Sequence, residues 1–193
     1  YDVSIDVPQR SPTFCPGCPY RPFYYTLGMF IREMKIDAVI SGDIGCYSLG
    51  VCRPYQLHDT LISMGSSVGM AHGFSKVLDE FIISIIGDST FLHAGIPALI
   101  NAVYNGAKFV LIVLDNLTTG MTGHQPHPGT GLRADGSMGK VIKIEEIAKA
   151  CGVEFVEVVN SYDVKKLEEV IREALKHDLA VVIARQYCSI VRM

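Results

Sequence analysis

The sequence predicts an α/β fold: a mostly parallel sheet with helices on both faces. Strand-like and helix-like segments alternate at least four times along the chain, and residues 81–86 and 108–114 are largely apolar, β-branched runs. Such runs are typical of strands buried on both faces of a parallel sheet, and the alternation is typical of a doubly wound sheet. Because the 193 residues contain no internal repeat, we expect a single domain over residues 1–193.

The first predicted elements are an arm, a helix and a short strand. Residues 1–19 hold four of the nine prolines and no apolar periodicity, so they predict an extended arm. Residues 20–35 have apolar side chains at helical spacing, with Pro22 in the first turn, which predicts a helix. Residues 38–40 predict a strand that ends in the polar segment 41–46.

The central elements alternate between helix and strand. We expect a glycine-rich helix around residues 65–78, a strand over 81–86, a helix over roughly 94–105 and a strand over 108–114. Residues 115–142 are rich in glycine, contain two prolines and show no periodicity. A loop of this length in a compact domain usually carries function.

The last quarter of the chain continues the alternation. Ser161 and Asp163 both precede a helical pattern as N-cap candidates. The charged run 165–173 predicts a solvated helix face. The predicted elements here are helices over 144–151 and 164–177 and strands over 154–159 and 180–185.

Composition excludes several classes of protein. Seventeen Lys and Arg against twenty Asp and Glu give a net charge of −3, without a basic block, so we expect no nucleic-acid partner. The apolar runs are far shorter than the ~20 residues that span a bilayer, so we expect no membrane partner. Charged residues make up only 19%, below the usual ~25%, which predicts apolar surface covered by other protein in an oligomer.

Cysteine usage indicates a reducing compartment, which we take to be the cytoplasm. Six cysteines in 193 residues are about 3%, well below the ~8–10% of a disulfide scaffold. The sequence has no signal peptide and begins with Tyr1, so we expect part of the protein to lie outside it.

Polar residues follow two consecutive buried strands. Gly87-Asp88-Ser89 ends one strand and Asp115-Asn116 ends the next. Because the carboxyl ends of parallel strands share one rim, Asp88 and Asn116 are expected to meet there. Their oxygens, with a diphosphate, a main-chain carbonyl and water, would complete an octahedral Mg²⁺ site. The alternative is a helix-capping aspartate and a turn-forming Asp-Asn pair.

These segments resemble the thiamine-diphosphate binding motif, which has Gly-Asp-Gly or Gly-Asp-Ser followed by a pair that ends in Asn. The resemblance implies that Asp88 and Asn116 bind Mg²⁺ through their side chains and Thr118 through its main-chain carbonyl. The residues that it implies in cofactor binding are Gly45, Cys46, Gly65, Ser66, Gly87, Asp88, Ser89, Thr90, Asn116, Thr118, Gly120, Met121 and Thr122.

The glycine-rich segment 118–129 resembles the corresponding loop of indolepyruvate:ferredoxin oxidoreductases, a branch of the 2-oxoacid:ferredoxin oxidoreductases, and segment 64–73 is similar to this family too. Pyruvate-using relatives have an Asn here that faces the substrate, whereas this chain has Met121 and Thr122. A soft methionine suits a bulkier apolar substrate. His124 would bind an oxoacid carboxylate or move protons, the alternative being an ordinary loop histidine.

Other histidines give weaker signals. We interpret His127 as an ordinary loop histidine and His58 as a turn residue. His72 and His93 are expected near the rim.

Four cysteines match the ligands of the [4Fe–4S] cluster nearest thiamine in the 2-oxoacid:ferredoxin oxidoreductases. The family has an N-terminal CxxC, a Gly-Cys after an early strand and a Cys after the last strand; here these are Cys15, Cys18, Cys46 and Cys188. Zinc fits the same four thiolates, and a Cys15–Cys18 disulfide is a third interpretation. Cys52 and Cys151 have no counterpart and are interpreted as structural.

The resemblance implies oxidative decarboxylation of indolepyruvate or another aryl 2-oxoacid to an acyl-coenzyme A, with electrons passed through the cluster to ferredoxin. It also implies a pyrimidine-binding domain or subunit, for which this sequence shows no segment. One alternative is a subunit of a non-oxidative decarboxylase of the sulfopyruvate or phosphonopyruvate type, which does not need the four cysteines. Another is a non-catalytic dinucleotide- or metal-binding module of Rossmann type, although no Gly-x-Gly-x-x-Gly follows the first strand.

Overall fold

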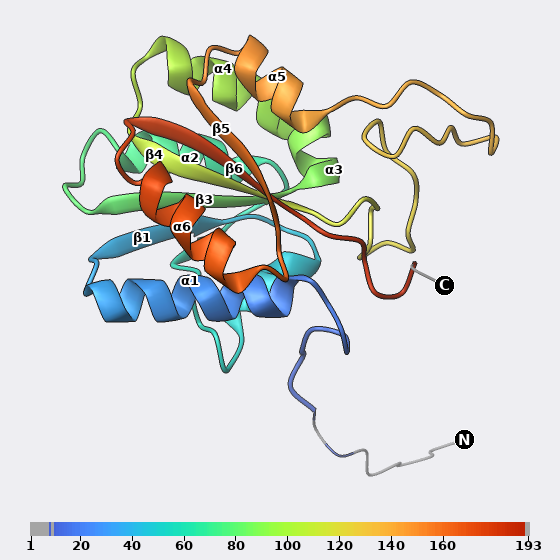
Figure 1. Cartoon of the computed structure of the whole chain (residues 1–193), viewed down its shortest axis with the longest axis horizontal. Coiled ribbons are helices and arrows are strands. Elements are labelled where there is room, and N and C mark those ends of the chain that lie inside the picture. Colours follow the sequence, from blue (N-terminus) through green and yellow to red (C-terminus); the bar gives the residue numbers. More distant parts are fainter. Residues whose placement is uncertain (1–7, 9, 192–193) are drawn as a thin grey trace, which may run out of the picture.

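Six strands form one parallel sheet in the computed structural model, which describes residues 8 and 10–191 (Figure 1). The strand order is β2-β1-β3-β4-β6-β5, and every neighbouring pair is parallel. The predicted fold class is therefore confirmed. Residues 1–7 and 9 of the expected arm lie outside the described residues. The strands are β1 (Ala38–Gly42), β2 (Thr60–Leu61), β3 (Phe81–Gly87), β4 (Phe109–Asp115), β5 (Phe155–Asn160) and β6 (Leu179–Arg185).

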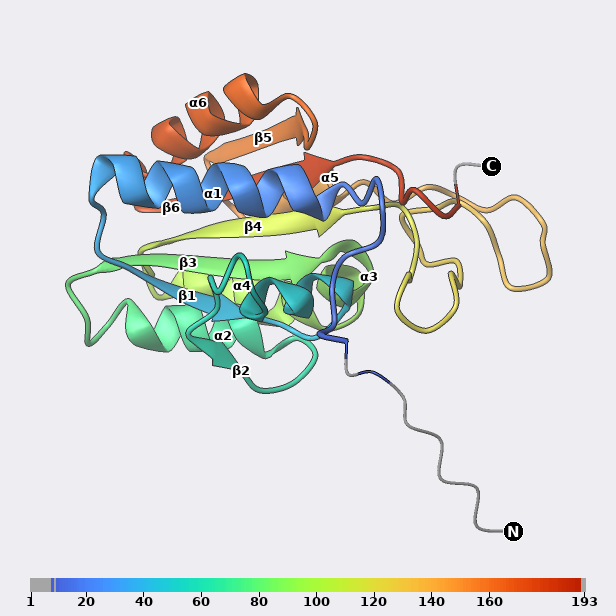
Figure 2. The same ribbon diagram turned by 90° about the horizontal axis from the view of Figure 1, so that it is seen from below.

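Helices cover both faces of this sheet. Figure 2 shows α1 (Tyr20–Met34) and α6 (Val164–Ala174) on one side of the strands, with α2 (Ser66–Phe74) and α4 (Ile96–Tyr104) on the other. Helix α5 (Ile144–Ala150) packs on the same side as α4. The sheet is thus the middle layer of three, as expected for a doubly wound fold.

Side-chain alternation along β4 divides the core into two halves. Val110, Ile112 and Leu114 pack toward α1 and α6. The residues between them, such as Leu111 and Val113, pack toward α2, α4 and α5. Because both faces of β4 are covered, its sequence is an unbroken apolar run and not an alternating one.

Strand register brings the ends of the central strands level. Gly87 pairs with Leu114, and Asp115 pairs with Arg185. The segments that follow β3, β4 and β6 therefore leave the sheet at the same edge. In Figure 2 the long loop after β4 extends beyond this edge, on the side where the C-terminal segment also lies.

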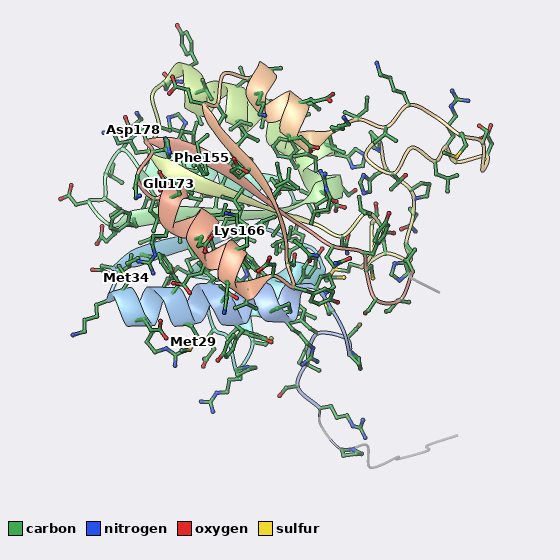
Figure 3. All side chains as sticks on the ribbon, in the orientation of Figure 1. Met29, Met34, Phe155, Lys166, Glu173 and Asp178 are labelled. Carbon is green, nitrogen blue, oxygen red and sulfur yellow. The ribbon has the colours of Figure 1, made fainter. Side chains whose placement is uncertain are left out.

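Helix α6 shows how the sequence pattern determines packing. Leu167 and Ile171 are buried against the core, whereas Lys166 and Glu173 point outward (Figure 3). The predicted solvated face is confirmed. Asp163 caps the helix, since its Oδ1 accepts a hydrogen bond from Lys166 N at 3.1 Å. The hydroxyl of Ser161 is buried without a partner and does not cap.

Three local elements differ from the prediction. The two-residue strand β2 and the 3₁₀ helix η1 (Cys46–Val51) are too short to produce a periodic pattern. The helix predicted from about residue 94 begins at Asp88, as α3 (Asp88–Thr90), and continues through a π turn, η2 (Phe91–Gly95), into α4. Pro97 has no N–H to donate into this wide turn. The polar first turn hides the start of the helix from apolar periodicity.

Within residues 8 and 10–191, no helix combines the length and the apolar character needed to cross a bilayer.

The packing of α1 gives a stability prediction. Leu27 is 0% exposed in the core, whereas Tyr25 on the same helix is 59% exposed. We expect Leu27→Ala to lower the free energy of unfolding by about 2–5 kcal/mol, because it leaves a cavity. The control Tyr25→Ala should change it by less than about 0.5 kcal/mol. Urea unfolding measures both values, and equal losses would contradict this assignment of the core face.

Candidate active site

The carboxyl ends of β1, β3 and β4 surround one pocket of about 450 Å³, counting its open mouth. The expectation that Asp88 and Asn116 meet at one rim is confirmed, and the segment after β1 lies at the same rim. Eleven of the predicted site residues line this pocket: Gly45, Cys46, Gly87, Asp88, Ser89, Thr90, Asn116, Thr118, Gly120, Met121 and Thr122. The lining residues that sequence reasoning missed are Tyr20, Ile44, Tyr47, Met64 and Thr119.

Asp88 lies at the centre of the polar contacts behind the pocket. Its Oδ1 accepts a hydrogen bond from Ser89 N at 2.8 Å, and its Oδ2 lies 3.1 Å from Nε2 of His127. The two strand-end segments are joined directly, because Thr119 Oγ1 donates to Ser89 Oγ at 3.0 Å. Asn116 Oδ1 accepts from Thr118 N at 3.3 Å in a tight turn. Asp88 and Asn116 thus face one pocket from adjacent strand ends.

A second buried carboxylate stands beside Asp88. Burial and the nearby charge of Asp88 raise the pKa of Asp115 to about 6. Arg185 opposes this rise, with its Nε 2.6 Å from Asp115 Oδ2 and its Nη2 2.7 Å from Glu145 Oε2. One arginine therefore compensates part of a concentrated negative charge. Such a site suits a divalent cation with oxygen ligands.

Asp43, just after β1, fixes the start of α2 through main-chain contacts. Its Oδ1 accepts from Gly65 N at 2.9 Å and its Oδ2 from Ser67 N at 3.0 Å. The aspartate therefore caps the N-terminus of α2, where a negative charge is favourable. Gly65 and Ser66, both predicted cofactor contacts, lie at this helix start and not among the lining residues.

Two glycines, Gly45 and Gly87, pack closely against the ring of Tyr47. A Cβ on Gly45 or on Gly87 would lie 2.4 Å from Cε1 of Tyr47. Glycine at both positions lets the β1 and β3 ends approach the ring closely. The Tyr47 hydroxyl donates to Ile44 O at 2.8 Å and lies 3.2 Å from Thr90 Oγ1.

Four cysteines lie close enough to affect one another. Burial, with smaller contributions from the thiols of Cys15, Cys188 and Cys46, raises the pKa of Cys18 to about 11. Burial also raises the pKa of Cys46, with contributions from Cys188 and Cys15. Cys46 itself lines the pocket. All six cysteines are free, so the Cys15–Cys18 pair is not a disulfide here.

Donors from distant parts of the chain hold the CxxC turn in place. Tyr162 Oη donates to Gly17 O at 2.6 Å, and Ser189 Oγ donates to Pro16 O at 3.0 Å. Arg21 Nε donates to Cys15 O at 2.9 Å. Arg21 thus contacts the turn directly.

The predicted substrate residues differ in their placement. Met121 lies in the pocket lining and is half exposed. His124 lies outside the lining residues, and its buried Nδ1 has no hydrogen-bond partner within residues 8 and 10–191. His93 lies near the rim, with Nδ1 3.3 Å from Ser89 Oγ. The expectation for His72 is wrong, because it lies in the last turn of α2, next to Asn101 and away from the rim.

The donor set suits two kinds of group. In the part of the chain that the structure describes, no three His, Cys, Asp or Glu side chains are grouped to hold a single metal ion. An oxygen site made from one carboxylate, one amide and one main-chain carbonyl needs no such group, and Asp88, Asn116 and Thr118 provide these types. The four neighbouring cysteines are the second set of donors, and thiolates are ligands of zinc and of iron–sulfur clusters alike.

Comparison with known proteins agrees with this geometry. Residues 43–184 match the family "Thiamine pyrophosphate enzyme, C-terminal TPP binding domain". The chain belongs to this family. This TPP-binding domain is 57% identical to indolepyruvate oxidoreductase subunit IorA of Archaeoglobus fulgidus over 97% of its own length, but spans only 30% of that protein.

Two further similarities extend the comparison. The TPP-binding domain is 30% identical to sulfopyruvate decarboxylase subunit beta of Methanococcus maripaludis, over 79% of its own length and 75% of that protein. It also resembles a solved 2-oxoglutarate:ferredoxin oxidoreductase from Magnetococcus marinus, with TM-score 0.81 and 20% identity over 97% of this chain and 67% of that chain. The structural similarity supports the fold.

Gly87 gives a prediction about the pocket wall. In Gly87→Ala, the added Cβ collides with the Tyr47 ring, so the ring must move. We expect the free energy of unfolding to fall by about 1–3 kcal/mol. We also expect thiamine diphosphate to bind at least about tenfold more weakly. Gly73→Ala is the matched control, since nothing lies within 4 Å of its added Cβ in α2. It should stabilise the helix by about 0.5–1 kcal/mol. Calorimetry measures cofactor binding, and urea unfolding measures the stability of both variants. Unchanged cofactor binding in Gly87→Ala would contradict the importance of the close contact between Gly87 and Tyr47.

His58 gives a prediction about pH. Burial lowers the pKa of His58 to about 4, and its Nε2 lies 2.8 Å from the Tyr24 hydroxyl. The unfolded state therefore binds a proton at higher pH than the folded state, so stability is lost as the pH falls from about 6.5 toward 4. The loss should approach roughly 3 kcal/mol. The free energy of unfolding, measured with urea between pH 6.5 and 4, should fall less steeply with pH in His58→Gln than in the wild type. Identical pH dependence in the two proteins would contradict a neutral buried His58.

Proposed function

We propose that this chain is the diphosphate-binding domain of a thiamine-dependent 2-oxoacid:ferredoxin oxidoreductase that acts on indolepyruvate or other aryl pyruvates. One observation carries the proposal: the Gly87-Asp88-Ser89 and Asn116–Thr122 segments line one pocket, and Cys46 in the same lining belongs to the group of four interacting cysteines. A diphosphate site and an electron acceptor would then be direct neighbours.

The chain would bind the diphosphate through Mg²⁺. Asp88 and Asn116 would provide side-chain oxygens, and Thr118 its main-chain carbonyl. The two adjacent carboxylates support this assignment: burial and, after it, the charge of Asp88 raise the pKa of Asp115, and a cation would neutralise part of this negative charge. Thiamine diphosphate, when bound, supplies the carbanion that attacks a 2-oxo carbon and stores the electrons that decarboxylation releases.

The four cysteines Cys15, Cys18, Cys46 and Cys188 would hold a [4Fe–4S] cluster. Cys188 follows β6 and donates its main-chain N–H to Asn116 O at 3.1 Å, which ties one ligand to the end of β4. Cys46 follows β1 at the pocket. The CxxC turn, the segment after β1 and the segment after β6 would thus hold the cluster beside the cofactor. There it would accept electrons one at a time.

The mouth of the pocket would select the substrate. Met121 presents a flexible apolar side chain to the opening, which suits an aryl group. His124 would bind the carboxylate of the oxoacid, because its Nδ1 has no hydrogen-bond partner among the described residues. Movement of the exposed loop would bring this nitrogen to a carboxylate.

Other parts of the enzyme would complete the reaction. The chain spans about a third of the length of the indolepyruvate oxidoreductase subunits that it matches. A pyrimidine-binding domain or subunit would supply the carboxylate that activates thiamine. Ferredoxin would take the electrons and coenzyme A the acyl group, within an oligomer. The six free cysteines suit a reducing compartment, which we take to be the cytoplasm.

A subunit of a non-oxidative 2-oxoacid decarboxylase is the second candidate. It is favoured by the similarity to the sulfopyruvate decarboxylase subunit, of which the chain covers 75%. Such an enzyme has no use for a cluster of four cysteines next to the pocket. The metal content therefore separates the two functions.

The test is to purify the assembled enzyme without oxygen and to measure iron, zinc and indolepyruvate-dependent reduction of ferredoxin. We expect about four irons per chain and activity that requires coenzyme A. Cys46→Ser should lose iron and electron transfer, whereas the control Cys52→Ser should keep both. Decarboxylation without iron would favour the second candidate, and zinc in place of iron would contradict the cluster.

A further inference from the structure

We infer that His127 is a positioning residue, which holds the Asp88 carboxylate in place and fastens the loop between β4 and α5 to the diphosphate site. This inference rests on the proposed function, because it treats Asp88 as a ligand of Mg²⁺. His127 Nε2 lies 3.1 Å from Asp88 Oδ2, and the side chains of both residues are buried, at 0% and 4% exposure. The sequence alone gives no reason to connect residues 39 positions apart.

The hydrogen bonds of the ring determine which nitrogen faces Asp88 as a donor. Gly129 N donates to His127 Nδ1 at 3.1 Å, so Nδ1 is an acceptor and the hydrogen of the neutral ring is on Nε2. Nε2–H then donates to Asp88 Oδ2. Glycine at 129 permits this close approach, because a Cβ there would lie 2.9 Å from Cε1 of His127.

The donation from His127 completes the set of contacts that orient the carboxylate. Oδ1 of Asp88 receives the Ser89 N–H and Oδ2 receives His127. Each oxygen keeps a lone pair for a cation in the pocket. Without His127, the carboxylate would lose one of its two donors while the Asp115 carboxylate remained beside it. Outer contacts of this kind typically change metal affinity by about 10–100-fold.

The same ring connects the loop to the sheet. The main-chain oxygens of His127 and of the next residue are occupied within the loop: His127 O accepts from Thr130 N at 2.9 Å, and Pro128 O accepts from Ile142 N at 3.0 Å. The buried ring therefore fastens an internally bonded loop to Asp88. Arg133 and Lys140, farther along the same loop, are exposed. The rate of trypsin cleavage after these two residues therefore reports how firmly the loop is attached to the sheet.

The experiment compares His127→Phe and His127→Gln in the assembled enzyme. Phe keeps the ring shape without a donor, whereas Gln keeps an N–H near the position of Nε2. For Phe we expect about 10–100-fold weaker binding of Mg²⁺ at saturating thiamine diphosphate, and for Gln binding within about threefold of wild type. Trypsin should cleave after Arg133 and Lys140 faster in the Phe variant than in the Gln variant.

His72→Phe is the control, because His72 contacts Asn101 on the helical layer away from the pocket; it should match wild type in both measurements. Wild-type binding and loop protection in His127→Phe would overturn the inference. Equal losses in Phe and Gln would also overturn it, since packing would then explain both. If the Phe variant does not fold, tenfold weaker binding by the Gln variant overturns it. Wild-type enzyme that binds no Mg²⁺ with thiamine diphosphate overturns the proposed function itself.

Discussion

The burial of one carboxylate, Asp88, constrains the whole rim of the sheet. A buried charge is costly unless it is paired or hydrogen-bonded, and here the compensation comes from Ser89 N and His127 Nε2, which lie on different segments. Asp115 adds a second negative charge, and Arg185 opposes it from β6. The hydrogen bonds and the ion pair of these two acidic side chains therefore hold together the ends of β3, β4 and β6 and the long loop.

The pocket and the cysteines form a continuous arrangement around this carboxylate. Cys46 is a member of the pocket lining and of the cysteine group, while the main chain of Cys188 is bonded to that of Asn116. Burial raises the pKa of both Cys46 and Tyr20, and the neighbouring charge of Asp88 adds to the rise. Groups that belong to different motifs in the sequence thus share one electrostatic environment.

Much of this arrangement could be predicted from the sequence, because it depends on patterns within single segments. Apolar runs identify β3 and β4, and polar residues directly after them identify the rim. Tyr47 was missed because its role depends on glycines in two strands that rest on its ring. His127 was underestimated for the same kind of reason: its partner, Asp88, is remote in sequence and is reached only when the loop folds back. Helix α3 was missed because its polar first turn has no apolar face.

The CxxC turn has a consequence for the order in which the chain takes shape. Two of its carbonyls are held by Tyr162 and Ser189, which the ribosome adds long after the turn has left the exit tunnel. Contacts over such long sequence separations form late and slowly. During synthesis, Cys15 and Cys18 therefore remain unassembled thiols until Tyr162 and Ser189 have been added, and the CxxC turn reaches its final position late.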